Sequence, residues 1–257
     1  MIVNYSQDGW EIITQRAHGI VAAQLASQWR ASDRPERWIE TILAIAEHDD
    51  AENELDGEIL ITAAGGPLNY AMKSFELPHC RKLASLTITK SRYIALLTSM
   101  HMEFLYGQDE SKSAVAKSFL EEQRSLQETW RHDLKLTKKE ALRMYNLVEW
   151  CDALSLLICK GDMQPEERSM EISTGPDNRI YQLLQLNEKE LSVDPWPFED
   201  ESFEIRFDSR LIKQIAFKDS AEFRKAFLEA EITEKVWTIK KPVIKKTPVK
   251  KSKKLDK

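Results

Sequence analysis

Apolar residues recur at every third or fourth position over most of the first 160 residues, a spacing that predicts a series of amphipathic helices. Two of the expected helices, over residues 91–107 and 137–159, have specific sequence signals at their ends. Ser91 precedes one apolar run, and Thr137 with Glu140 forms a capping box before another. Gly107 and Gly161 mark the ends of these two helices. The helices expected from the pattern cover residues 14–30, 33–49, 78–89, 91–107, 112–134 and 137–159.

Short β-rich runs lie at both ends of the chain. Residues 2–5 and 10–13 flank Asp8-Gly9, which is a hairpin signal. After residue 161 the helical period stops, and residues 165–176 are expected to form a loop. The later segments with strand character are residues 181–186, 190–193, 203–207 and 236–239, with a short helix over 220–229. The pattern therefore predicts a mainly α fold, in which the N-terminal hairpin and the C-terminal strands form a small antiparallel β-sheet.

The chain has 257 residues, of which 42% are hydrophobic and 31% charged, as is ordinary for a globular protein. We expect one domain over residues 1–239, with a β-rich extension over about 165–239, and a separate Lys-rich tail over 240–257. The tail holds nine Lys and one Asp, whereas the net charge of the whole chain is -5. The body is thus strongly acidic, which disfavours nucleic-acid binding by its overall field.

The tail has the composition of a disordered, solubilising end. Electrostatic contact of these lysines with nucleic acid or an anionic membrane is the less favoured alternative. No apolar stretch approaches the ~18 residues that span a bilayer, and the first residues do not form a secretory signal. Three cysteines without a CxxC pair fit a reducing compartment, so we expect a cytoplasmic protein.

Five residues of the types that bind metals fall in or at the end of apolar helices: His18, His48, Asp49, His101 and Asp152. Asp152 stands in the most apolar run of the chain. A buried carboxylate without a partner costs several kcal/mol, so Asp152 requires a metal, a buried Arg or Lys, or a helix N-terminus. Taken alone, His18 and His101 are better explained as ordinary core histidines, and His48-Asp49 is consistent with an ordinary helix C-terminus. Together the five residues form a mixed nitrogen and oxygen set that suits Mn²⁺, Fe²⁺, Zn²⁺, Ni²⁺ or Mg²⁺.

Such a site would lower the pKa of a bound water and produce a hydroxide nucleophile, with Asp49 ligating and orienting that water. Arg16, two residues before His18, is a candidate for binding a substrate phosphate, although a solvated surface role is slightly favoured. Gly19 leaves room for another helix or a ligand to approach closely. The second His-Asp pair, residues 132–133, lies at a charged helix end and is expected at the surface.

The order of His18, His48-Asp49 and Asp152 on separate helices resembles the HD-domain superfamily of metal-dependent phosphohydrolases, over residues 14–160. The resemblance implies an HD-like helical bundle, a divalent metal, and hydrolysis of a small phosphorylated substrate, either a phosphoester or a nucleotide. His101 falls where some members carry an additional histidine for a second metal. Residues 10–18, 44–50 and 95–101 also resemble a bacterial family known only as a domain of unknown function. The alternative reading is an HD-like binding or regulatory protein without catalysis.

Overall fold

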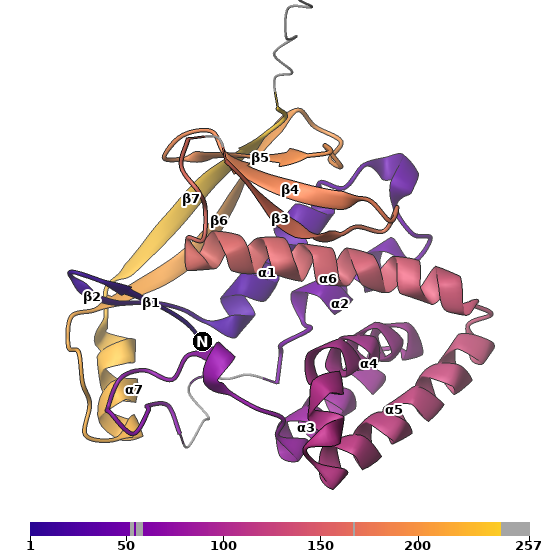
Figure 1. Cartoon of the computed structure of the whole chain (residues 1–257), viewed down its shortest axis with the longest axis horizontal. Helices are drawn as coiled ribbons and strands as arrows, with labels where there is room; N and C mark the ends of the chain where they lie inside the picture. The colour runs from indigo at the N-terminus through magenta and orange to yellow at the C-terminus, as the bar shows by residue number, and fades with distance from the viewer. Residues whose placement is uncertain (52–53, 55–58, 167, 243–257) are drawn as a thin grey trace, which may run out of the picture.

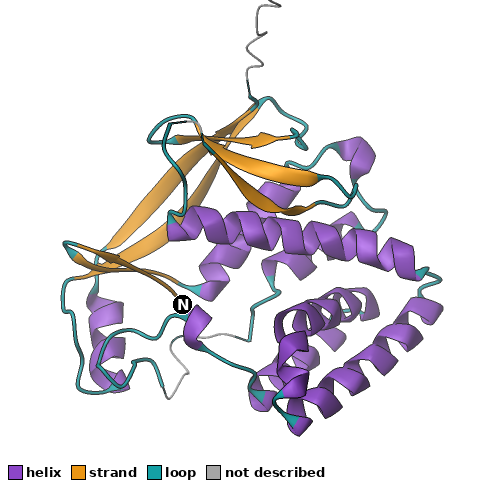
Figure 2. Ribbon diagram, viewed as in Figure 1, coloured by secondary structure: helices purple, strands orange, loops and turns teal. Residues whose placement is uncertain are grey.

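A strongly curved seven-stranded sheet packs against a set of helices in the computed structural model (Figures 1 and 2). The structure describes residues 1–51, 54, 59–166 and 168–242. Seven α-helices are present in these residues: α1 (Gln15–Ser27), α2 (Trp38–Ala46), α3 (Leu77–Ile88), α4 (Arg92–Tyr106), α5 (Ala114–Asp133), α6 (Lys138–Lys160) and α7 (Ser220–Glu229). The strands are β1 (Ile2–Ser6), β2 (Gly9–Ile13), β3 (Ser169–Thr174), β4 (Ile180–Gln185), β5 (Glu190–Asp194), β6 (Ser202–Ile212) and β7 (Ile232–Lys240).

The sheet overturns the predicted fold class. Its strand order is β1-β2-β6-β7-β5-β4-β3, and it forms a half-barrel rather than a small accessory to a mainly α bundle. The expected pairing of the N-terminal hairpin with C-terminal strands is present, because β2 pairs antiparallel with β6. The sheet is nevertheless mixed, since β5 and β7 run parallel. One strand lies where a loop was expected: β3 occupies residues 169–174.

The predicted helix starts at Thr14, Ser91 and Thr137 are correct. In each case the side-chain oxygen accepts a hydrogen bond from a backbone N–H of the first turn. The capping box of Thr137 and Glu140 is formed, and Gly161 ends α6 with a left-handed φ of 69°. The start of α2 differs from the expectation, because a short 3₁₀ turn, η1 (Ala31–Asp33), occupies the expected beginning and α2 starts at Trp38.

Helices α6 and α1 both connect the sheet to the other helices, since α1 contacts β6. Helix α6 contacts β1 and β3 on one side and α1, α2 and α4 on the other, whereas α3, α4 and α5 pack together away from the sheet (Figure 1). The main core joins the buried Trp29, Trp150, Tyr181 and Phe198 through edge-to-face and tilted ring contacts. This core fixes the position of α6 relative to α1. One candidate ligand projects from each of these two helices, Asp152 from α6 and His18 from α1.

The described part of the chain contains no helix that is long and apolar enough to cross a membrane. The three cysteines, Cys80, Cys151 and Cys159, are buried and free. The expected Lys-rich tail begins inside β7, which ends at Lys240, and residues 243–257 lie outside the described residues.

Candidate metal centre

Four helical segments bring the five candidate residues together at one point. His18 comes from α1, His48 and Asp49 follow the end of α2, His101 lies on α4, and Asp152 lies on α6. The three imidazoles are almost wholly buried, and their ring centroids are 4.9 Å apart between His18 and His48 and 5.0 Å apart between His48 and His101. The ligand-type atoms of His18, His48 and Asp49 lie within 4.8 Å of one another, as do those of His48, His101 and Asp152.

Gly19 allows α1 and α2 to approach closely at this point. A Cβ atom at Gly19 would lie only 2.4 Å from the carbonyl oxygen of Ala46, the last residue of α2. Because His18 precedes Gly19 and His48 follows Ala46 by two residues, the same contact sets the distance between the two histidines. The space that the sequence assigned to Gly19 is therefore filled by a helix end.

The Nδ1 atoms of two imidazoles are held by neighbouring groups. His48 Nδ1 lies 2.7 Å from the carbonyl oxygen of Ile45, which can only accept, so this nitrogen carries a proton. His18 Nδ1 lies 3.0 Å from Ser155 Oγ. The Ser155 hydroxyl itself donates to the carbonyl oxygen of Asp152, at 2.8 Å, so Ser155 Oγ accepts from His18. His101 Nδ1 lies 3.4 Å from the hydroxyl of Tyr145.

The opposite ring nitrogens all face the carboxylates. His18 Nε2 lies 3.1 Å from Asp49 Oδ2, and His48 Nε2 lies 3.2 Å from Asp152 Oδ1 and 3.6 Å from Asp49 Oδ2. His101 Nε2 is 4.0 Å from Asp152 Oδ2. Although it is close to two carboxylates, His48 Nε2 is buried without a hydrogen bond of acceptable geometry. In neutral imidazoles with the proton on Nδ1, these nitrogens direct lone pairs at negative oxygens, an arrangement that requires additional protons or a cation.

The pKa shifts of the cluster residues reflect the need for positive charge beside the two carboxylates. Burial opposes protonation of His48, but the charges of Asp49 and Asp152 outweigh it and raise the pKa of His48 to about 10. Burial would raise the pKa of Asp49 and Asp152, yet the charge of His48 and the other histidines holds both below their ordinary values. Burial and the charge of His48 lower the pKa of His101 to about 4. The cluster thus holds two ionised carboxylates, and the proton on His48 offsets only part of their negative charge.

Gln15 is a further member of the site that the sequence did not indicate. Its side-chain amide donates to Asp49 Oδ2 at 2.9 Å, and its Oε1 is buried without a partner. Gln15 directly follows the N-cap Thr14 and precedes His18 by three residues, so both side chains lie on one face of α1. That spacing was available in the sequence, but a glutamine one residue after a helix cap carries no metal signal by itself.

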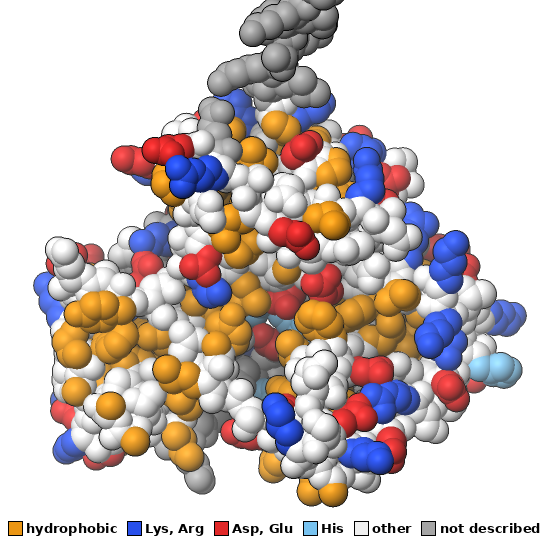
Figure 3. All heavy atoms as spheres, viewed as in Figure 1, with side chains coloured by type: hydrophobic (Ala, Val, Ile, Leu, Met, Phe, Trp, Pro, Cys, Tyr) orange, Lys and Arg blue, Asp and Glu red, His pale blue; other side chains and the backbone are white. Residues whose placement is uncertain are grey.

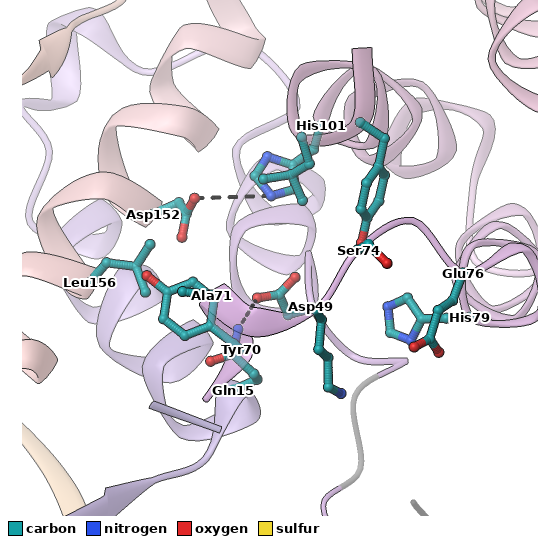
Figure 4. A pocket seen from close by; sticks show the side chains of 13 residues that line it. Gln15, Asp49, Tyr70, Ala71, Ser74, Glu76, His79, His101, Asp152 and Leu156 are labelled. Atoms are coloured by element: carbon teal, nitrogen blue, oxygen red, sulfur yellow. Dashed lines mark hydrogen bonds and ion pairs between the residues drawn. The ribbon is translucent and has the colours of Figure 1, made fainter. Parts of the chain in front are cut away.

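A cleft of about 220 Å³ opens above the cluster and gives it access to solvent. Figure 3 shows histidine and acidic side chains at the bottom of this hollow, between apolar borders. Asp49, His101 and Asp152 line its floor, and the close-up shows them facing the open space (Figure 4). Its walls come from the segment before α3, from α3, and from the ends of α4 and α6: Tyr70, Ala71, Lys73, Ser74, Glu76, His79, Leu105, Tyr106 and Leu156.

Arg16 does not line this cleft. Its side chain is 52% exposed and pairs with Asp50, with Nη2 2.6 Å from Oδ1. The role of Arg16 in binding a substrate phosphate therefore stays a prediction, and the basic residues that line the cleft itself include Lys73. The second His-Asp pair is at the surface as expected, since the His132 side chain is 91% exposed.

Asp152 was expected to need one of three partners: a metal, a buried Arg or Lys, or a helix N-terminus. Its described ion-pair partners are the histidines His18, His48 and His101. Asp152 lies inside α6, well away from the start of that helix at Lys138. The two alternatives to the metal thus find no support in the described part of the chain.

Residues 1–214 match a family described as "Protein of unknown function (DUF3891)". The chain belongs to this family. No curated protein and no solved structure matches the chain significantly. The family match includes all five candidate ligands and the residues that line the cleft, but it assigns no activity, and the resemblance to the HD superfamily remains a resemblance.

Proposed function

We propose that this member of the family is a metal-dependent phosphohydrolase that acts on a small phosphoester or nucleotide. The observation that carries the proposal is the convergence of three histidine Nε2 atoms on two carboxylates, of which Asp49, Asp152 and His101 reach the floor of an open cleft. Histidines that ligate metals commonly have the other ring nitrogen fixed by a hydrogen bond, as is the case for His18 and His48 here. The order of these residues along the chain is also the order that resembles the HD superfamily.

The donor set fits a divalent ion. One ion would be held by His18, His48 and Asp49. A second group of possible ligands consists of His48, His101 and Asp152, so His48 belongs to both groups. Imidazole and carboxylate together suit Mn²⁺, Fe²⁺, Zn²⁺, Ni²⁺ or Mg²⁺ and do not select among them. The buried His48 Nε2, which has no hydrogen-bond partner, gives a specific reason for a cation at this position.

A divalent ion held here would supply Lewis-acid chemistry, because it lowers the pKa of water toward neutrality and offsets the charge that grows on a phosphoryl oxygen. Asp49 is the residue proposed to orient the attacking water. The amide of Gln15 occupies Asp49 Oδ2, so the orientation of this carboxylate is fixed. The ammonium group of Lys73 at the cleft would attract the phosphoryl group before reaction. A cytoplasmic location is part of the same proposal.

The test is the metal content of the purified protein, measured by elemental mass spectrometry, beside a paired set of variants. His48→Ala/Asp49→Ala removes ligands from the cluster, whereas His132→Ala/Asp133→Ala removes the exposed His-Asp pair and serves as the matched control. We expect one or two transition-metal ions per chain in the wild type and in the control, and loss of metal in the first variant. Full metal retention in His48→Ala/Asp49→Ala would contradict the proposed metal site.

Turnover is tested separately, with para-nitrophenyl phosphate and the same three proteins loaded with Mn²⁺. We expect hydrolysis by the wild type and the control only. A protein that binds metal but hydrolyses no phosphoester under Mn²⁺, Fe²⁺, Zn²⁺, Ni²⁺ or Mg²⁺ would contradict the proposed activity. It would favour a binding or regulatory role.

A further inference from the structure

The cleft above the cluster has an apolar end and a polar end. Tyr70 and Leu156 lie together on the side of α6 (Figure 4). Both are only partly buried and pack against the main core with their inner surfaces, so their outer surfaces border the cleft. They come from distant parts of the chain: Tyr70 begins the 3₁₀ turn η2 (Tyr70–Met72), and Leu156 lies one helical turn beyond Asp152 on α6.

Polar side chains gather at the opposite end of the cleft, although Leu105 and Tyr106, from the end of α4, also line the cleft. Ser74, Glu76 and His79 lie across the cleft from Leu156, on the segment that leads into α3 and on α3 itself (Figure 4). Asp49 and His101 lie between the two ends. A substrate whose reacting phosphorus sits above these central residues must therefore extend over the apolar end, the polar end, or both.

The size of the cleft limits what it can accept. Its volume of about 220 Å³ is smaller than the roughly 300 Å³ at which pockets that enclose drug-sized ligands begin. A ring with a phosphoryl group is of this size, whereas the base, sugar and phosphate of a nucleotide would have to extend beyond the cleft.

The apolar end supplies binding energy only to an apolar group. Water that covers Tyr70 and Leu156 gains nothing from staying there, and its displacement by a ring is favourable in proportion to the apolar area that is buried. Burial raises the pKa of the Tyr70 phenol above its ordinary value, so its hydroxyl remains protonated and adds no negative charge beside a phosphoryl group. A polar leaving group would gain none of this energy at this end.

We infer that the cleft selects a small phosphomonoester that carries a single apolar or aromatic ring, with the ring seated against Tyr70 and Leu156. This inference rests on the proposed phosphohydrolase function, and it refines that function from phosphoesters in general to aryl-type monoesters. It also separates the chain from hydrolases of long nucleic acids, for which the acidic body is unsuited.

Binding of phosphonates tests the inference without any turnover, because their phosphorus–carbon bond is not hydrolysed. Phenylphosphonate and methylphosphonate carry the same charged group and differ in the ring. In calorimetric titrations of the Mn²⁺-loaded full chain, we expect phenylphosphonate to bind about 10-fold more tightly than methylphosphonate. Equal affinities, or binding of neither compound, would overturn the inference, whatever the outcome of the para-nitrophenyl phosphate assay.

Variants locate the ring within the cleft. Leu156→Asn should reduce the preference for phenylphosphonate to less than 3-fold and leave the affinity for methylphosphonate unchanged. Tyr70→Asn, from a different element, should have the same effect and provides the answer if the first variant does not fold. Leu142→Asn alters a 48% exposed leucine of α6 that does not line the cleft, and it should keep the full preference. A preference that persists in both cleft variants would place the ring elsewhere and contradict the inference.

Discussion

The hydroxyl of Ser155 fixes which nitrogen of His18 carries the proton. It accepts from His18 Nδ1 and donates to the backbone of Asp152, so one side chain connects a proposed ligand of α1 with the helix that carries another. Ser155 is wholly buried, and no solvent can replace it. The side chain therefore influences the metal-facing nitrogen without touching the cleft.

Substitution of Ser155 should weaken metal binding more than it weakens the fold. Ser155→Ala leaves His18 Nδ1 without an acceptor, and we expect a 10- to 100-fold loss of Mn²⁺ affinity by titration, as for other groups that orient ligating histidines. Ser192→Ala is the control, because Ser192 is equally buried but its hydroxyl has no hydrogen-bond partner. Equal affinities of the two variants would show that Ser155 does not orient His18.

Glu149, three residues before Asp152, couples stability to pH. Burial, and to a lesser extent the charge of Asp152, raises the pKa of Glu149 from 4.5 to about 7. Between pH 4.5 and 7 the folded state therefore keeps a proton that the unfolded state has released, so this group lowers the free energy of unfolding as pH rises through that window. With allowance for solvent screening of this half-buried group, the loss is ~1–2 kcal/mol.

Urea denaturation of wild type and Glu149→Gln at several values between pH 4.5 and 8 checks this expectation. Glutamine cannot ionise, so the difference in unfolding free energy between variant and wild type should shift in favour of the variant as pH rises to 7. Glu128→Gln, at an exposed position of α5, should follow the wild-type profile. Parallel profiles for wild type and Glu149→Gln would refute the coupling.

At the scale of elements, Gly19 controls how closely α1 and α2 pack. Gly19→Ala places a methyl group against the carbonyl oxygen of Ala46, and backbone cannot move aside as a flexible side chain can. We expect a loss of about 1–3 kcal/mol in the free energy of unfolding by urea, the usual cost of overpacking. Gly107→Ala, where nothing lies within 4 Å of the added Cβ, should change stability by less than about 0.5 kcal/mol. Equal effects of the two variants would mean that the helix contact is not constrained.

The helices were predictable where caps and apolar period coincide, as at Thr137, and less so where they do not. In α2 almost every residue is apolar, so the period does not select a face. The apolar Ile39 and Leu43 are 76% and 40% exposed, while Thr41, Ala44 and Ile45 are buried. Strand β3 was missed because only Ile172 of its six residues is buried. Its strand conformation comes from pairing with β4, which the local sequence does not express.

At the scale of the whole molecule, β7 is the central strand of the sheet. It pairs with β6 over nine residues and lies parallel to β5, so it connects the N-terminal hairpin to β3, β4 and β5. It lies beyond residue 214, where the family match ends. Local patterns predicted a strand at residues 236–239, but the order of strands depends on contacts between residues far apart in the chain, and periodicity carries no information about those.

The core contribution of β7 can be measured by two substitutions on the same strand. Ile239 is wholly buried in the main core, whereas Ile232 is 51% exposed. We expect Ile239→Ala to lower the free energy of unfolding by about 2–5 kcal/mol and Ile232→Ala by less than about 0.5 kcal/mol. A small effect of Ile239→Ala on the free energy of unfolding would mean that β7 contributes little to the stability of the fold.

The candidate ligands themselves were recognisable in the sequence, because each is a polar residue in or beside an apolar helix. What the sequence could not provide was the cleft above them. Tyr70 lies in an irregular segment whose position depends on the packing of α3, α4 and α6, and His79 lies on α3 without any neighbouring signal. The position of each ligand follows from its own helix, while the binding surface follows from the assembled molecule.

Alkylation of the three buried cysteines can report how often each part of the fold opens. Burial raises the pKa of Cys80 to about 12 and raises the pKa of Cys151 and of Cys159 well above the ordinary value of a thiol, so none presents a thiolate to solvent while the fold is closed. Cys151 immediately precedes Asp152, and Cys80 lies on α3 at the other end of the helical layer. The rate at which each thiol is alkylated therefore measures how often its own region opens. A slower rate at Cys151 than at Cys80 in the presence of Mn²⁺ would show that the ion stabilises α6 against local opening.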